Sequence, residues 1–307
     1  MRLPAVLILL LLSLSLAAAG CAGRQDDASP SPATSNNASL PENGGGPETS
    51  HAATAPGQEE GEASPETGSP SAEPAPASPD RPEPVPLYRM NAVYDIVPVD
   101  SEKTDKRVAL LTFDDGPKSA DTLGPMLDIL DKHGAKAIFF VNGYRVEKNP
   151  DLLKEIYDRG HAVGNHSWDH IPLGKEKPET VRDQIGRVQD IVKELTGEAP
   201  RFFRPPHASG SDDVRRIARE FGLLYMTWSN GSLDWDLGKV KEEDRPQAVI
   251  DNVLKQLRPG SNILMHELPW TAEALDRLLA AILDEGYRFV DPREIATENA
   301  ENEGVSP

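Results

Sequence analysis

The stretch of sequence that decides the fold reads Val108-Ala109-Leu110-Leu111-Thr112-Phe113-Asp114-Asp115-Gly116-Pro117. Its first six residues form a short apolar run, which predicts a buried strand. Two adjacent carboxylates follow this run directly, and the Gly-Pro pair after them predicts a turn. Functional side chains in parallel α/β proteins lie at the ends of such strands, so this stretch indicates both a fold class and a candidate site.

Towards the C-terminus, short apolar runs alternate with amphipathic helices. Strands are predicted at 108–113, 137–141, 161–164, 201–203, 223–228, 262–266 and 287–290. Helices are predicted at 123–132, 151–159, 178–195, 212–221, 245–257 and 271–285. About seven β-α units predict a parallel α/β architecture, and both a doubly wound sheet and a small (β/α) barrel fit. The chain has no Gly-rich phosphate loop, which disfavours a nucleotide-binding version.

Towards the N-terminus, residues 1–21 predict a secretion signal, with a positive start at Arg2 and an apolar run at 3–16. The single cysteine, Cys21, follows small residues, and Ala-Ala-Gly-Cys resembles a bacterial lipoprotein signal. Lipid on Cys21 would hold the protein on a membrane surface, at the bacterial cell envelope. An ordinary cleaved signal with an incidental cysteine is the alternative.

Residues 22–86 are rich in Pro, Ser, Ala, Gly and Glu and show no hydrophobic period. Such a segment buries too little apolar surface to offset chain entropy, so we expect a disordered linker. The predicted folded domain spans 87–299, and 300–307 is a predicted disordered tail.

The composition excludes several classes of protein. The 307 residues contain 50 acidic and 32 basic side chains, for a net charge of −18. An excess of acid argues against binding of nucleic acid. One cysteine excludes a disulfide framework, and a mean hydropathy of −0.48 excludes a polytopic membrane protein. We expect a monomer.

A candidate metal site is suggested by Asp115 together with His166 and His170, which are four residues apart. Two histidines and one carboxylate leave room for a bound water, as in hydrolytic zinc sites. The same ligand types suit Fe(II) oxygenases, so they do not decide the metal. The alternative to a metal site is that Asp115 belongs to an ordinary turn and that the two histidines lie on the surface without a ligand.

Two further groups follow predicted strands. Arg204 precedes two prolines, so its backbone would be rigid and its side chain could hold a carboxylate. The alternative is a surface arginine whose aliphatic stem packs against the protein. His266 ends an apolar strand and has Asp234 as a possible partner. It is therefore a candidate general acid, with a buried core histidine as the alternative.

Taken together, five stretches resemble the motifs of the polysaccharide deacetylases with a NodB-homology domain, carbohydrate esterase family four. They lie at 112–117, 166–170, 202–207, 228–235 and 263–267, in the family's order. The resemblance covers roughly 108–290. It implies a distorted (β/α) barrel of about seven units and hydrolysis of N-acetyl groups on an amino sugar.

The resemblance also implies roles for individual residues. Asp114 would be the general base, oriented by Arg204, and His266 the general acid, held by Asp234. A divalent metal, usually zinc but with cobalt, nickel or manganese also possible, would be held by Asp115, His166 and His170. Trp235 and Leu264 would line the acetyl pocket, and the backbone N–H of His207 would stabilise the oxyanion.

The chain departs from the family pattern at a few positions. His207 stands where Tyr is usual, Ala208 where Gly is common, Gly231 where the fourth motif often has Asp, and Glu267 where Asp is usual. None of these changes removes an expected metal ligand or proton carrier. We expect these four changes to affect which substrate the protein prefers.

The function expected is therefore deacetylation of an envelope glycan, with peptidoglycan the first candidate. Chitin-like oligomers, poly-N-acetylglucosamine and O-acetylated xylan are further candidate substrates. A glycan-binding lipoprotein without turnover is an alternative on the same fold. A glycosidase is disfavoured, because Asp114 and Asp115 are adjacent instead of opposed across a sugar bond.

Overall fold

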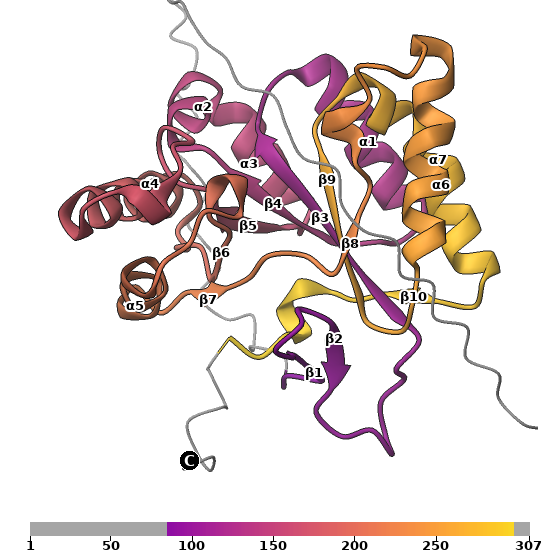
Figure 1. The fold of residues 1–307 in the computed structure, drawn as a ribbon, viewed down its shortest axis with the longest axis horizontal. Coiled ribbons are helices and arrows are strands. Elements are labelled where there is room, and N and C mark those ends of the chain that lie inside the picture. The colour runs from indigo at the N-terminus through magenta and orange to yellow at the C-terminus, as the bar shows by residue number, and fades with distance from the viewer. Residues whose placement is uncertain (1–84, 298–307) are drawn as a thin grey trace, which may run out of the picture. The chain divides into compact units, whose positions relative to one another are not determined.

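The computed structural model describes residues 85–297 (Figure 1). The predicted signal at 1–21, nearly all of the predicted linker at 22–86 and the predicted tail at 300–307 lie outside the described residues. Between 85 and 297, no helix has both the length and the apolar character needed to cross a membrane.

A parallel sheet of eight strands forms the centre of this part of the chain. Its strands are β3 (Val108–Gly116), β4 (Ala137–Val141), β5 (Ala162–Asn165), β6 (Phe202–Phe203), β7 (Leu224–Tyr225), β8 (Asn230–Gly231), β9 (Ser261–His266) and β10 (Arg288–Phe289). Their order is β7-β6-β5-β4-β3-β9-β8, and β10 pairs with the start of β3. The strand predicted first from the sequence thus lies in the middle of the sheet.

Helices alternate with the strands, as the periodicity predicts. They are α1 (Ala120–Lys132), α2 (Gly143–Lys148), α3 (Pro150–Asp158), α4 (Pro178–Thr196), α5 (Asp212–Glu220), α6 (Arg245–Gln256) and α7 (Pro269–Asp284). Each long helix buries one apolar face; α1, for example, buries Leu123, Met126, Leu127 and Leu130. The short helix α2 was not predicted from the sequence pattern.

The sheet is curled into a distorted (β/α) barrel, which decides between the two architectures left open by the sequence (Figure 1). Residues 226–229 run directly from β7, at one edge of the sheet, to β8, at the other. The carbonyl oxygen of Thr227 accepts hydrogen bonds from Arg204 Nη2 at 2.8 Å and Asn262 Nδ2 at 3.1 Å. This extended segment, held by polar side chains, connects the two edges.

Successive side chains of β3 point to opposite faces of the sheet. Leu111 and Phe113 pack in the cluster beneath the helices, whereas Leu110 packs with Ile138 and Phe140 in a second cluster. Thr112 and Asp114 continue the face of Leu110. The same alternation therefore places Asp114 at the carboxyl end of the barrel's interior face.

A hairpin that was not predicted from the sequence precedes the sheet. Strands β1 (Tyr88–Met90) and β2 (Ile96–Pro98) pair antiparallel. The backbone N–H of Ile96 donates to the carbonyl of Gly260 at 2.8 Å, just before β9. Gly260 has a φ of 86°, and a Cβ there would lie 2.4 Å from the Ile96 oxygen, so the contact requires glycine.

Candidate active site

A bulge at the end of β3 brings two adjacent carboxylates to one place. Neighbouring residues of a regular strand point to opposite faces. The pairing of β3 with β4 shifts between Asp114 and Gly116, and Asp115 has a φ of 67°. As a result, Asp114 Oδ2 and Asp115 Oδ1 lie 3.7 and 3.5 Å from the same nitrogen, His166 Nε2. Bulges that redirect a side chain in this way are common beside active sites.

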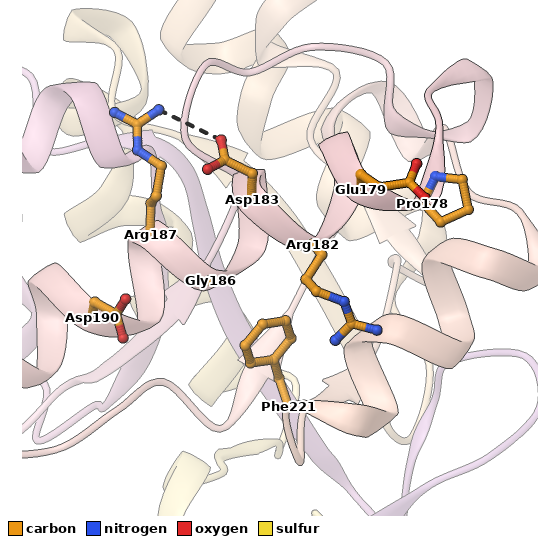
Figure 2. Close-up of a pocket in the computed structure, with 8 residues that line it drawn as sticks. All are labelled: Pro178, Glu179, Arg182, Asp183, Gly186, Arg187, Asp190 and Phe221. Carbon is orange, nitrogen blue, oxygen red and sulfur yellow. Dashed lines mark ion pairs between the residues drawn. The ribbon is translucent and has the colours of Figure 1, made fainter.

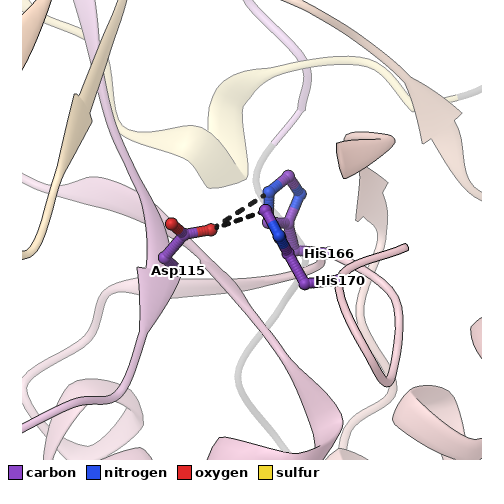
Figure 3. A group of neighbouring side chains, drawn as sticks. All are labelled: Asp115, His166 and His170. Carbon is purple, nitrogen blue, oxygen red and sulfur yellow. Dashed lines mark ion pairs between the residues drawn. The ribbon is translucent and has the colours of Figure 1, made fainter. Parts of the chain in front are cut away.

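Asp115, His166 and His170 converge on one point, from the end of β3 and the loop after β5 (Figure 3). Asp115 Oδ1 lies 3.0 Å from His170 Nε2 and 3.5 Å from His166 Nε2, and the three ligand atoms are all within 4.8 Å of one another. Ligands about 2.0–2.2 Å from a tetrahedral ion lie roughly 3.3 Å apart. The spacing therefore suits a single bound cation.

The donor atoms of these residues are also suited to a cation. The Arg204 carbonyl, 2.7 Å from His166 Nδ1, can only accept, so Nδ1 carries the proton and Nε2 keeps its lone pair. Asp115 Oδ1 is buried without a hydrogen-bond partner. Burial raises the pKa of Asp115, but His166 and His170, when their imidazoles are protonated, outweigh it and hold that pKa below its usual value. The carboxyl is thus ionised, as a metal ligand must be.

Asp114 is bound by a fully buried arginine. Arg204 Nη1 donates to Asp114 Oδ1 at 2.7 Å and to Thr112 Oγ1 at 2.8 Å. The Thr112 hydroxyl in turn donates to the Ile263 carbonyl at 2.7 Å. Arg204 is 0% exposed and Asp114 3%, so this pair lies away from water. The family resemblance implied that Arg204 orients Asp114, and these two side chains are hydrogen-bonded; Thr112 was not assigned from the sequence.

A second pair, a partly buried histidine and a buried aspartate, lies on the other side of Asp114. His266, at the end of β9, is the register partner of Asp114 on β3. His266 Nδ1 lies 2.7 Å from Asp234 Oδ1, so Nδ1 carries the proton and Nε2 is left for another partner. Asp234 lies in a short 3-10 helix at 234–236 that follows β8. Asp114 therefore stands between the Asp-His-His cluster and the His266–Asp234 pair.

The remaining predicted residues lie around these groups. Trp235 is 45% exposed, and its ring lies edge-on to that of His266 at 5.3 Å between centroids. Leu264 is buried in β9, two residues before His266 and on the same face of the strand. His207 is exposed, and its ring lies 4.6 Å from that of the candidate ligand His170.

Strained backbone is concentrated in the loops that carry these residues. Seven non-glycine residues between 85 and 297 have a positive φ, and all but Tyr94 lie in the β3 bulge or in the loops around the site: Asp115, Ser167, His170, His207, Ala208 and Leu233. Such conformations cost about 1–3 kcal/mol each and persist only where the surroundings enforce them. Such clustering of positive φ values is typical of functional sites and supports this end of the barrel as the candidate site.

Several residues that support the site were not found from the sequence. Thr271 Oγ1 donates to Asp234 Oδ2 at 2.7 Å, and Trp270 Nε1 donates to the Asp234 carbonyl at 2.9 Å. Asn262 Nδ2 donates to the Thr227 carbonyl. Thr112 and Asn262 were visible as polar residues within apolar strands, but nothing in the sequence connects Thr271 with Asp234.

A separate groove of about 570 Å³ lies on the outer surface along α4 (Figure 2). Both of its arginines lie near carboxylates. Arg187 Nη1 lies 3.8 Å from Asp183, and Arg182 forms an ion pair with Glu220. It contains none of the predicted site residues, so the candidate site remains at the strand ends.

Fold and geometry together define a class, a distorted (β/α) barrel with an Asp-His-His centre at the carboxyl ends of its strands. The chain belongs to the polysaccharide deacetylase family, whose family model matches residues 101–226. That match begins just before β3 and ends after β7. The resemblance inferred from the five motifs is thereby confirmed.

Relatives support this membership. The peptidoglycan-N-acetylglucosamine deacetylase PgdA of Listeria monocytogenes is 39% identical over 201 residues, which are 65% of this chain and 41% of that protein. The chain therefore matches less than half the length of that relative. A peptidoglycan-N-acetylglucosamine deacetylase of Bacillus cereus is 36% identical over 191 residues, which are 61% of this chain and 67% of that protein.

The fold is likewise similar to solved structures of carbohydrate esterase family four. One is a pseudoenzyme of this family from Bacillus anthracis, with a TM-score of 0.56 and 30% identity. The match covers 61% of this chain and 64% of that one. The family thus includes a described pseudoenzyme, so the fold alone does not establish turnover.

Proposed function

We propose that this protein is a metal-dependent hydrolase that removes N-acetyl groups from an amino-sugar polysaccharide of the cell envelope. One observation carries the proposal: the carboxylate of Asp114, held by a buried arginine, lies between a candidate metal cluster and a histidine that is paired with a buried aspartate. Amide hydrolysis needs a base, an electrophilic centre and an acid close together. This arrangement offers residues for all three.

The proposed metal ligands are Asp115, His166 and His170. Their nitrogen and oxygen donors suit zinc, and cobalt, nickel or manganese would also be accepted. A divalent cation held there would supply a Lewis acid that lowers the pKa of a water and polarises the acetyl carbonyl.

Asp114 is the proposed general base. It takes a proton from the water as the water oxygen forms a bond to the acetyl carbon. Arg204 occupies Asp114 Oδ1, which leaves Oδ2 on the side of the metal cluster, 3.7 Å from His166 Nε2. The arginine therefore selects the oxygen that accepts the proton.

His266 is the proposed general acid. The carbon–nitrogen bond breaks as the nitrogen takes a proton from His266 Nε2, so acetate and a free amine leave. Asp234 holds the imidazole through Nδ1 and favours its protonated form. The backbone N–H of His207 is the proposed donor to the oxyanion of the addition step, and Trp235 with Leu264 would enclose the acetyl methyl group.

Peptidoglycan is the proposed substrate. The relatives from Listeria and Bacillus cereus are named for the deacetylation of its N-acetylglucosamine, and a Bacillus subtilis relative, 32% identical, is named for its N-acetylmuramic acid. These names favour a wall glycan over chitin or xylan. They leave both sugars of the wall as candidates.

A glycan-binding protein without turnover is the second candidate function, because a pseudoenzyme is among the similar structures. The presence here of both carboxylates and all three histidines of the proposed chemistry argues against it. Release of acetate from a panel of acetylated glycans, before and after chelation, tests the proposal. Acetate released only with metal supports it, whereas binding without any release supports the second candidate.

We further propose that residues 1–21 direct export and that lipid on Cys21 anchors the protein to the membrane, with 22–86 as a tether. The single cysteine after small residues supports this. Cys21→Ser should move the protein from the membrane fraction to the soluble fraction and leave turnover of a soluble glycan unchanged. Membrane retention of this variant would contradict the anchor.

A further inference from the structure

A buried carboxylate with no role in the proposed chemistry joins two neighbouring strands at the candidate site. Glu267 directly follows His266, at the end of β9, and is only 2% exposed. Its Oε1 accepts hydrogen bonds from the backbone N–H groups of Lys118 and Ser119, both at 2.9 Å, and its Oε2 accepts from Lys118 at 2.9 Å. A buried carboxylate is costly unless donors of this kind satisfy it. The contact therefore fixes the loop that follows β3 against the end of β9.

The same loop is also held by groups that follow β4, the neighbour of β3 on the side away from β9 (Figure 1). The carbonyl of Gly116 accepts from the backbone N–H of Asn142 at 3.1 Å, and the carbonyl of Pro117 accepts from Asn149 Nδ2 at 3.1 Å. Gly116 permits a close approach, because a Cβ there would lie 2.9 Å from Glu267 Oε2. The loop is thus bound to the segments that follow both neighbouring strands.

The residue just before this loop is a strained candidate metal ligand. Asp115 has a φ of 67°, which a residue with a side chain keeps only where its surroundings enforce it. In this conformation its Oδ1 lies 3.0 Å from His170 Nε2 and 3.5 Å from His166 Nε2. If the loop were released, Asp115 could relax towards an ordinary strand conformation, and its carboxylate would turn away from the two imidazoles.

We propose that Glu267 is a positioning residue for the candidate metal site. Through the two backbone amides that it binds, it keeps Asp115 in the conformation that directs the ligand oxygen to the histidines. The inference rests on the proposed metal-dependent function. The role requires an oxygen that accepts both hydrogen bonds and does not require a negative charge, so it differs from a direct attraction of the cation by Glu267.

Two conservative variants separate the hydrogen bonds from the charge. Glu267→Gln keeps an oxygen of the same reach, which can take the place of Oε1 and accept both backbone bonds. Glu267→Asp keeps the charge, but its side chain is one methylene group shorter, so its carboxylate is drawn away from both amides. Glu267→Met removes both the acceptor and the charge. Glu273→Met, at an exposed position of α7, is the matched control.

The affinity of the full chain for Zn²⁺ is measured without glycan, by competition with a chromophoric chelator, and urea unfolding of the metal-free proteins is measured beside it. We expect Glu267→Met and Glu267→Asp to weaken zinc binding about tenfold, as losses of groups that orient metal ligands do. Glu267→Gln should stay within about threefold of the wild type. The Glu273→Met control should bind zinc as the wild type does.

The opposite order, weak binding by Glu267→Gln and near wild-type binding by Glu267→Asp, would assign Glu267 to direct attraction of the cation and overturn the inference. Lower stability with unchanged zinc affinity in all three variants would overturn it as well, because the role would then be structural only. If Glu267→Met does not fold, the comparison of Glu267→Gln with Glu267→Asp still decides. A wild type that binds zinc but releases no acetate from any glycan would overturn the proposed deacetylation alone.

Discussion

Asp234 Oδ1 lies 2.7 Å from His266 Nδ1, and the aspartate is completely buried while the histidine reaches the site. Asp234 Oδ2 accepts two further bonds of 2.7 Å, from the His266 backbone N–H and from Thr271 Oγ1. Burial lowers the pKa of His266, but the bond to Asp234 outweighs it and raises that pKa above its ordinary value. The imidazole is therefore protonated at higher pH than a free histidine, as an acid that protonates an amine should be.

Removal of the charge of Asp234 should shift the pH profile of deacetylation. If protonated His266 is required, activity is lost as the pH rises through its raised pKa. Asp234→Asn removes the anion that raises this pKa, so the alkaline limb of kcat/KM should move to lower pH. Thr271→Val, which keeps the charge, is the control and should shift the limb much less. An alkaline limb unmoved by Asp234→Asn would contradict the assignment.

Much of the fold was predictable because the main helices and the central strands β3, β4 and β9 are strongly patterned. The apolar run at 108–113 and the one-sided face of 123–132 both appear as β3 and α1, with boundaries shifted by a few residues. The hairpin β1–β2 was missed since its strands have three residues each, too few to show a period. Strand β8 is shorter still.

The site was predictable in membership but not in geometry. The sequence indicated that Asp115 and two histidines could share an ion, and their ligand atoms do converge. It could not show how adjacent Asp114 and Asp115 reach the same imidazole, because that depends on the bulge and the positive φ of Asp115. Nor could it show that Arg204 Nη1 bridges Asp114 and Thr112, a contact between segments about 90 residues apart.

The two neighbouring aspartates should respond differently to the same substitution. Asp115→Asn removes an ionised candidate ligand, so bound metal should fall well below one per molecule after dialysis. Asp114→Asn leaves the three candidate ligands in place, so metal should remain while turnover falls about 10²- to 10⁴-fold. Elemental analysis and acetate release on the same preparations measure both. Metal loss from Asp114→Asn alone would reverse the two assignments.

His161 should make stability depend on pH. It is 3% exposed, packs edge-on against Phe139, and burial lowers its pKa from 6.5 to about 4. The unfolded chain therefore binds a proton below pH 6.5 that the folded chain does not bind until pH 4. The free energy of unfolding should fall by about 3 kcal/mol as the pH drops through this window.

His161→Gln removes this titration and serves as the comparison. Urea unfolding at a series of pH values between 7 and 4 should give a flatter profile for the variant, whatever its overall stability. The Asp115 carboxyl, whose pKa is lowered, titrates below the window and affects both proteins alike. Parallel profiles would show that His161 is protonated equally in the folded and unfolded chains.

The leaving group provides the sharpest test of His266. An amine leaves only when it is protonated, whereas the alkoxide of an O-acetyl ester leaves more easily. His266→Ala should therefore lower turnover of an N-acetyl glycan by about 10²- to 10⁴-fold and of an O-acetylated xylan oligomer by much less. Asp114→Asn is the matched control, because the base acts in the attack on both substrates and its loss should reduce both rates alike. Equal losses on the two substrates in His266→Ala would assign this histidine to positioning, and near wild-type turnover of the N-acetyl glycan would place the acid elsewhere.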